Sequence, residues 1–202
     1  RTGLGGVCFS TASYYMEILK HYPRLQKGVS IYHPDMQGPF DIAHLIWGPD
    51  IFVGLYDEPE LVHELLRLIT ETYSRYMLEW KALVGEGNDF TTHWNFYIKG
   101  GIMLRNDSAV MVTLRHYEEF IKPYDQVLLD KFGGCIHYCG RGNAFVQSMA
   151  KSNHLYGIHS SQPELNNVNR WLRSTSENNI VALGLPQSEL PEGLNTGVIL
   201  LR

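Results

Sequence analysis

The alternation of short apolar stretches with amphipathic, helix-like stretches constrains the fold of this chain more than any other feature of its sequence. Five apolar stretches have the length and β-branched content of buried strands: residues 29–33, 101–105, 134–137, 155–158 and 180–183. Strands that alternate with helices form βα units. The sequence therefore predicts an α/β fold with at least four parallel strands, right-handed connections and helices packed outside the sheet.

Caps and helical periodicity mark the segments between these strands. Residues 57–72 combine an acceptor cap and a proline in the first turn with apolar residues at helical spacing, which predicts a helix. A second helix is expected from Thr113 to Gly133, with Pro123 kinking or splitting it. Shorter helices are predicted at residues 40–48, 50–56, 143–151 and 167–178.

Length and composition exclude several classes of protein. The 202 residues, 44% hydrophobic and 19% charged, give room for one domain with a sizeable core and lie outside the range of disordered chains. The net charge is −4 and the Lys and Arg residues are dispersed, which argues against a nucleic-acid partner. No apolar run reaches the roughly 20 residues of a membrane helix, and three cysteines do not suit a disulfide framework. We therefore expect a cytoplasmic protein with no membrane partner.

Five βα units in series fit either an open doubly wound sheet or part of a closed eight-stranded barrel, and the periodicity does not decide between them. Because the chain starts at Arg1 and ends on the apolar run 197–202, we expect residues 1–202 to be a single, incomplete domain. In both architectures functional groups gather at the carboxyl ends of the strands. The polar residues that follow the first four predicted strands are His33, Asp35 and Gln37; Arg105, Asp107 and Ser108; His137, Cys139 and Arg141; and His159, Ser161 and Gln162.

The sharpest local signal is the sequence His137-Tyr138-Cys139. Residues two apart on a strand share a face and lie about 6 to 7 Å apart, so the imidazole and the thiolate can reach one ion, and this pair suits zinc. Cys135 has the same parity but lies about 13 Å from Cys139 in an extended chain, so we expect it to be a packed core thiol. A buried cysteine and a hydrogen-bonded histidine before a glycine turn give the same pattern, and spacing alone slightly favours that interpretation.

Two other segments have open roles. Asp107 could be an acid, a base or a substrate anchor, and it fits the cap of a turn equally well. Residues 33–39 carry His33, Asp35 and Gln37 as candidate substrate-binding groups, although their prolines also suit a rigid loop scaffold.

Four motifs, taken in order, resemble one family. They are Gln37-Gly38-Pro39-Phe40, the segment 55–66 around Asp57-Glu58-Pro59, the pair Asp107-Ser108 followed by the segment 117–124, and His137-Tyr138-Cys139-Gly140. Together they are similar to the uroporphyrinogen decarboxylase superfamily, which includes decarboxylases and zinc-dependent corrinoid methyltransferases that act on thiols. The resemblance implies a (β/α)8 TIM-type barrel longer than this chain, of which the N-terminal strands and the last segment are missing.

The histidine–cysteine pair is similar to the first part of the zinc motif in the methyltransferase branch, where another cysteine follows much later. No cysteine follows Cys139, so the third zinc ligand is not found in this chain by that pattern. The sequence also departs from the decarboxylase branch, because Leu45 stands at the expected tyrosine and Asp107 at the expected serine.

The resemblance therefore implies a methyltransferase that moves a methyl group from a corrinoid to a thiol. It implies zinc on His137 and Cys139, with Asp107 and His137 as catalytic residues. The substrate-binding residues would be His33, Asp35, Gln37, Arg105 and His159, and the partners a small-molecule thiol or tetrapyrrole and a corrinoid protein. Two alternatives stay open: decarboxylation of uroporphyrinogen or a related tetrapyrrole in porphyrin biosynthesis, with Asp107 or His137 as proton carrier, and tetrapyrrole or corrinoid binding without turnover.

Overall fold

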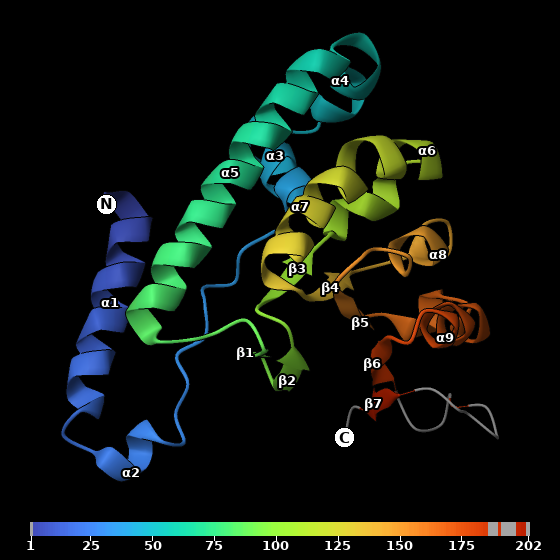
Figure 1. Cartoon of the computed structure of the whole chain (residues 1–202). Helices are drawn as coiled ribbons and strands as arrows, with labels where there is room; N and C mark the ends of the chain where they lie inside the picture. Colours follow the sequence, from blue (N-terminus) through green and yellow to red (C-terminus); the bar gives the residue numbers. More distant parts are fainter. Residues whose placement is uncertain (1, 186–189, 191–196, 201–202) are drawn as a thin grey trace.

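A five-stranded, all-parallel sheet lies at the centre of the computed structural model, which describes residues 2–185, 190 and 197–200 (Figure 1). Its strands are β3 (Ile102–Arg105), β4 (Gly134–Tyr138), β5 (Leu155–Ser160), β6 (Val181–Leu185) and β7 (Val198–Leu200). They are neighbours in sequential order, and every pair is parallel. The α/β fold and four of the five predicted strands are confirmed. The order of the described strands does not reverse, whereas a doubly wound sheet reverses at its switch point.

Helices cover one face of this sheet. Ile102, Leu104, Ile136 and Ile158 alternate along the strands and lie in one buried cluster with apolar side chains of the helices. These helices are α3 (Pro39–Trp47), α4 (Ile51–Asp57), α5 (Pro59–Val84), α7 (Lys122–Phe132), α8 (Val146–Met149) and α9 (Val168–Glu177). Because successive strand residues face opposite sides, the intervening residues point away from the helices.

A β-hairpin lies against the opposite face. It consists of β1 (Phe90–His93) and β2 (Phe96–Lys99), paired antiparallel. Phe96 and Ile98 of β2 form a buried cluster with Met103, Cys135 and Leu183 of the sheet. The sequence analysis did not predict this hairpin. Its insertion explains why the gap between the first two predicted strands is so long.

The predicted strand at residues 29–33 is wrong. These residues lie in an irregular connection between α2 (Pro23–Gln26) and α3. Val29 and Tyr32 are exposed, so the segment lacks the burial that its apolar composition suggested. A strand also needs a neighbouring backbone to pair with. This connection reaches the end of β3 later, at Gly38, whose N–H donates to the Arg105 carbonyl oxygen at 2.8 Å.

The helix predictions are mostly confirmed, with shifted ends. The helix expected at residues 57–72 is α5, which is longer and is capped at its C-terminus by Gly85 in the left-handed conformation. The helix expected from Thr113 is divided into α6 (Leu114–His116), a π-helical turn (Tyr117–Ile121) and α7, which has Pro123 in its first turn. The expected helix at residues 143–151 is reduced to the single turn α8.

The N-terminal helix α1 (Gly3–Leu19) was not predicted. It packs on α5 through Phe9 and Ala12, which form a small buried cluster with Trp80 (Figure 1). The apolar run at residues 197–202 contains β7, which pairs with β6. Residues 201–202 lie outside the described part of the chain.

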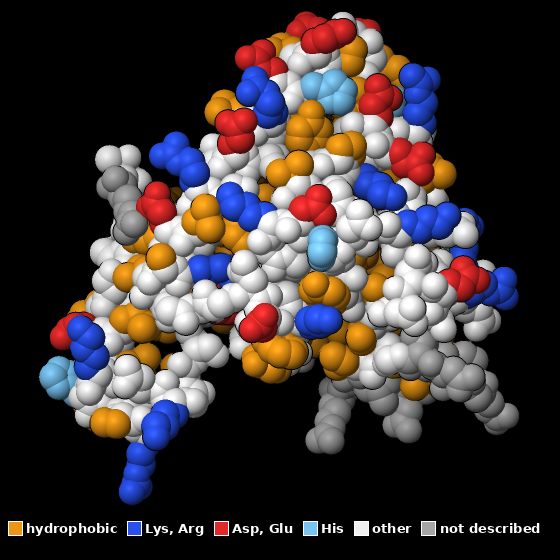
Figure 2. Space-filling view, in the orientation of Figure 1, with side chains coloured by type: hydrophobic (Ala, Val, Ile, Leu, Met, Phe, Trp, Pro, Cys, Tyr) orange, Lys and Arg blue, Asp and Glu red, His pale blue; other side chains and the backbone are white. Residues whose placement is uncertain are grey.

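Two surface properties bear on the expected partners. Among the described helices, none has both the length and the apolar character needed to cross a bilayer. On the face of the molecule in Figure 2, Lys and Arg side chains are scattered among Asp and Glu rather than gathered in a stripe.

Candidate metal centre

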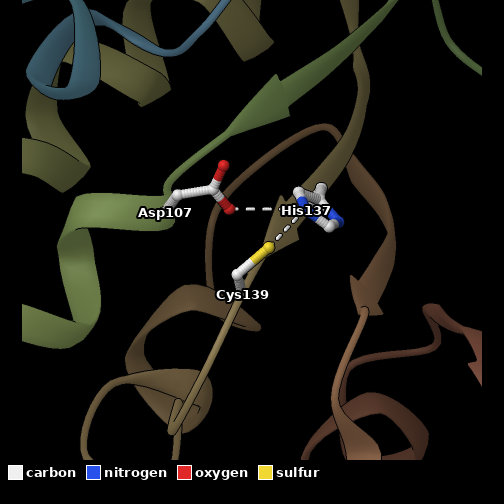
Figure 3. Close-up of side chains that lie close together, drawn as sticks. All are labelled: Asp107, His137 and Cys139. Carbon is white, nitrogen blue, oxygen red and sulfur yellow. Dashed lines mark hydrogen bonds and ion pairs between the residues drawn. The ribbon is translucent and has the colours of Figure 1, made fainter. Parts of the chain in front are cut away.

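Three side chains converge where β3 and β4 end (Figure 3). Arg105, His137 and His159 are register partners on three neighbouring strands, so their side chains point to the same face of the sheet. Asp107 and Cys139 follow this row by two residues each, at the start of the loops beyond the strands. The parallel register therefore brings together residues that are more than 20 positions apart in the sequence.

The ligand atoms of Asp107, His137 and Cys139 lie within 4.8 Å of one another. Nε2 of His137 is 3.3 Å from Oδ1 of Asp107 and 3.3 Å from Sγ of Cys139. For zinc bonds of about 2.0 Å to nitrogen and 2.3 Å to sulfur, tetrahedral ligand atoms are about 3.5 Å apart. The separations of Nε2 of His137 from the other two atoms are thus already near the spacing that one ion requires.

The arrangement differs from that of a nucleophilic cysteine site. In such a site the thiol contacts one imidazole nitrogen, and the residue that orients the ring contacts the other. Here the carboxylate and the thiol both contact Nε2 of His137. Oδ1 of Asp107 is buried and has no well-formed hydrogen bond among the described residues. Three donor atoms directed at one point, one of them without a hydrogen bond, are what a cation site provides.

His159 supports the ring of His137 from its other side. The two Nδ1 atoms are 2.7 Å apart, so one donates a proton and the other accepts it. If Nε2 of His137 is a metal ligand, Nδ1 of that ring carries the proton and Nδ1 of His159 accepts it. Burial, and then the charges of His137 and Arg105, lower the pKa of His159 to about 4, so this ring is neutral and able to accept.

The thiol and the carboxylate differ in charge state. Burial raises the pKa of Cys139, and the nearby Asp107 raises it further, against the hydrogen bond from Oγ of Ser161 to Sγ at 3.1 Å. Burial would also raise the pKa of Asp107, but its contacts with His137 and Cys139 outweigh burial and lower it. Without a cation the site therefore holds a protonated thiol beside a carboxylate, and a cation would displace the thiol proton.

The loop that carries Asp107 is held by Asp41 of α3. Asp41 accepts hydrogen bonds from the backbone N–H groups of Asp107, at 2.7 Å, and Ser108, at 2.8 Å. The Ser108 hydroxyl is also 2.9 Å from Nδ1 of His44. Helix α3 thus fixes the start of the 3-10 helix at Asp107–Met111 and, with it, the direction of the Asp107 side chain.

A buried hydrogen bond between Asn106 and Asp125 anchors the residue that precedes Asp107. Nδ2 of Asn106 donates to Oδ2 of Asp125 at 2.6 Å. Asp125 lies on α7, and burial raises its pKa to about 8. Gly38 closes the contact from α3, because a Cβ atom there would lie 2.5 Å from the Arg105 carbonyl oxygen. Asp107 is therefore held through its neighbours on both sides.

A second polar cluster lies next to the first. Arg105 forms an ion pair with Asp35, with Nη2 2.7 Å from Oδ2. Nε2 of His93 lies 3.5 Å from Oδ1 of Asp35, and the rings of His93 and His33 are 5.2 Å apart. Burial lowers the pKa of His33, and that of His93 to about 3. Both imidazoles are therefore neutral at physiological pH.

Trp94 lies between the two clusters. Its ring centroid is 5.0 Å from that of His137, 5.7 Å from that of His159 and 4.6 Å from that of His93. The Arg105 guanidinium packs over the indole, 4.3 Å from its centroid. Trp94 is the first residue of the two-residue hairpin turn and has a φ of 50°, a conformation that such turns require and that is rare for a bulky residue.

Most of the predicted site residues lie in this region. Asp107, His137, Cys139 and His159 are in contact, Arg105 and Asp35 are adjacent to them, and His33 joins through His93. Cys135 is buried against the hairpin, as expected for a core thiol. Gln37 is the exception, because it lines an apolar cavity of about 490 Å³ between α3 and α5.

Two residues that pack against the candidate site were missed, His93 and Trp94 of the hairpin. The signal that could have found them is the period-two burial of residues 90–99, in which Thr91, His93, Phe96 and Ile98 face inward. The third member of this group was not predicted as a metal ligand: the resemblance implied a later cysteine, and in the structure Asp107 offers the third possible ligand atom.

No family model matches the chain, and a search of curated proteins finds no match. The resemblance to the uroporphyrinogen decarboxylase superfamily therefore stays a prediction.

Proposed function

We propose that this chain is a zinc-dependent methyltransferase of the uroporphyrinogen decarboxylase superfamily, which transfers a methyl group from a corrinoid to a thiol. The observation that carries the proposal is the convergence of Asp107 Oδ1 and Cys139 Sγ on Nε2 of His137. The thiol would lose its proton and gain the methyl group, and the corrinoid would keep the electron pair of the broken cobalt–carbon bond.

The donor set fits zinc. It combines an imidazole nitrogen, a thiolate and a carboxylate oxygen, and three protein ligands leave a position for a substrate, as in catalytic zinc sites. A zinc ion bound there would lower the pKa of a substrate thiol and so favour the thiolate, the form that is nucleophilic.

The surrounding residues would orient the ligands and exclude water. His159 holds the tautomer of His137 through the contact of their Nδ1 atoms. Asp41 fixes the backbone that carries Asp107, and Ser161 donates to the thiol of Cys139. Trp94 covers the ring of His137 from the hairpin side, which lowers the local dielectric and strengthens each polar contact.

The fold and the partners are proposed on the same basis. A sheet whose described strands run in sequential order, with helices on one face, supports a (β/α)8 barrel of which these are five strands. We propose a small thiol and a corrinoid protein as partners, and no nucleic acid. Three free cysteines support a cytoplasmic location.

Methyl transfer from methylcobalamin to 1-propanethiol, followed by mass spectrometry of the thioether, tests the proposal. We expect zinc-dependent product with the native chain and with Cys135→Ala, because Cys135 is a core residue remote from the ligand atoms. We expect none above background with Cys139→Ala. Product that forms equally with Cys139→Ala would contradict the proposal. Turnover of uroporphyrinogen by the metal-free protein would replace it with the decarboxylase alternative.

A further inference from the structure

Arg105 brings a positive charge next to the candidate metal centre. It is the register partner of His137 on the neighbouring strand, and Asp107 follows it by two residues. Neighbouring strands lie about 4.8 Å apart. Oδ1 of Asp107 is 3.3 Å from Nε2 of His137. The long side chain of Arg105 therefore begins within reach of the carboxylate that would bind the ion.

An ion pair between Arg105 and Asp107 would be incompatible with that centre. A guanidinium binds a carboxylate through two parallel hydrogen bonds, which are among the strongest polar contacts in proteins. Such a pair would occupy the oxygen that the centre offers to a cation and would place a positive charge beside it. In the described part of the chain, however, the ion pair of Arg105 is with Asp35, and Oδ1 of Asp107 has no well-formed hydrogen bond.

Two groups hold the guanidinium of Arg105 away from Asp107. Nη2 of Arg105 lies 2.7 Å from Oδ2 of Asp35, and its guanidinium carbon lies 4.3 Å from the centroid of the Trp94 ring. The second distance is within the range of a cation–π contact. The side chain of Arg105 is 13% exposed, so water competes little for either contact. Both contacts act on the charged end of the side chain, the part that would otherwise meet Asp107.

The negative charge of Asp35 is directed at Arg105 and not at its other neighbour. Oδ1 of Asp35 is 3.5 Å from Nε2 of His93, and burial lowers the pKa of His93 to about 3. His93 is therefore neutral, which leaves Arg105 as the cation that pairs with Asp35. Asp35 lies in the irregular connection and Trp94 in the hairpin turn, so both reach Arg105 by tertiary packing. The position of the guanidinium thus depends on these two side chains.

We propose that Asp35 and Trp94 are positioning residues of the metal centre, which hold the guanidinium of Arg105 away from Asp107 and so keep Oδ1 of Asp107 available to a cation. The inference rests on the proposed function, because it takes the metal centre from that proposal. It gives Arg105 and Asp35 a role other than the substrate contacts that the family resemblance implies.

Zinc dissociation constants, measured in competition with a chelator, test the role of Asp35. Asp35→Asn keeps the shape of the side chain and removes its charge, and we expect zinc to bind about tenfold more weakly, as when a residue that orients a metal ligand is lost. Asp35→Asn combined with Arg105→Met also removes the competing guanidinium, so the affinity should return to within about twofold of the native value. The control Asp89→Asn removes an exposed carboxylate at the other end of the hairpin and should change the affinity by less than about twofold.

The same assay tests the role of Trp94. Trp94→Leu removes the aromatic face under the guanidinium, and we expect zinc to bind about threefold more weakly, in line with the strength of one cation–π contact. Trp94→Phe keeps an aromatic face and should recover most of that loss. Trp94→Leu combined with Arg105→Met should bind zinc as the native chain does.

Rescue by Arg105→Met separates positioning from damage to the fold, because damage to the fold would persist in the double variants. Native affinity in Asp35→Asn, or a double variant as weak as Asp35→Asn alone, would overturn the inference. Should Asp35→Asn not fold, Arg105→Met alone decides: affinity at least equal to the native value supports the inference, and a loss of affinity overturns it.

The thioether assay keeps the inference distinct from the proposed function. If the native chain binds zinc and the variants behave as expected but no thioether forms, the proposed methyl transfer fails and the inference stands. If thioether forms but Asp35→Asn binds zinc as tightly as the native chain, the inference alone fails. If the native chain binds no zinc, both fail.

Discussion

The two histidine clusters that contact Trp94 differ in what holds them in position. His137 and His159 project from neighbouring parallel strands, and the backbone register of β4 and β5 pairs them directly. His93 comes from a separate two-stranded hairpin and His33 from an irregular connection, so no strand register joins these two. The first cluster has three possible ligand atoms within 4.8 Å of one another, and in the second cluster Nε2 of His93 lies 3.5 Å from Oδ1 of Asp35. The comparison teaches that strand register holds one group of side chains in a fixed arrangement, whereas the hairpin and the connection bring the other group together only by packing.

Replacing one glycine of the parallel sheet and one glycine of the irregular connection with alanine should give the largest difference in stability between the two regions. A Cβ atom at Gly134 would lie 2.0 Å from the carbonyl oxygen of Ile102 on the next strand, whereas a Cβ atom at Gly28, in the irregular connection, would meet nothing within 4 Å. We expect Gly134→Ala to lower the free energy of unfolding by about 3 kcal/mol or more, and Gly28→Ala to change it by less than about 0.5 kcal/mol. Urea unfolding measures both. Equal effects would mean that the strands are no more constrained than the connection.

The strand side should also respond to pH through Asp125. Its raised pKa means that the folded protein keeps a proton that the unfolded chain releases above about pH 4, so the contribution of Asp125 to stability is greatest at low pH and falls as the pH rises toward about 8. Between pH 6 and pH 8 the loss should be about 2 kcal/mol. In Asp125→Asn, which cannot ionise, this loss should disappear, while Asp130→Asn on the same helix, with an exposed side chain, should retain it. A native-like pH profile for Asp125→Asn would refute this role.

Substitutions in the two clusters should also differ, by a smaller amount, in their effect on zinc affinity. His159→Phe removes the acceptor of the His137 ring proton, so we expect zinc to bind about tenfold more weakly in competition with a chelator. His159→Gln keeps a side-chain acceptor and should recover part of that loss. His93→Phe also changes a ring that packs on Trp94, but it touches no ligand atom and should alter zinc affinity by less than about twofold. Similar losses for His159→Phe and His93→Phe would show that packing on Trp94, and not the ring hydrogen bond, sets the affinity.

The sequence predicted four of the five parallel strands correctly but not the irregular connection. Residues 101–105, 134–137 and 155–158 were recognised because apolar runs bounded by glycine or polar residues are typical of buried strands. Residues 29–33 have a similar composition, but a strand exists only where a partner backbone runs alongside, and single-sequence periodicity contains no information about partners.

For the site, the sequence could place side chains that follow strands but not those that arrive by tertiary packing. Asp107, His137, Cys139 and His159 were found because parallel strands bring their carboxyl ends to one edge. Trp94 and His93 were not found, because the hairpin reaches the site by packing Phe96 and Ile98 on the sheet. Asp107 as a third possible ligand was missed because its distance from His137 depends on the loop that Asp41 holds.

X-ray absorption at the zinc edge of the zinc-loaded protein tests the central claim most directly. If Asp107, His137 and Cys139 hold the ion, the spectrum will contain one sulfur at about 2.3 Å together with nitrogen and oxygen atoms at about 2.0 to 2.2 Å. The sulfur contribution will vanish in Cys139→Ala and persist in Cys135→Ala. Bound zinc without a sulfur ligand in the native protein, or a sulfur ligand that survives in Cys139→Ala, would contradict the assignment.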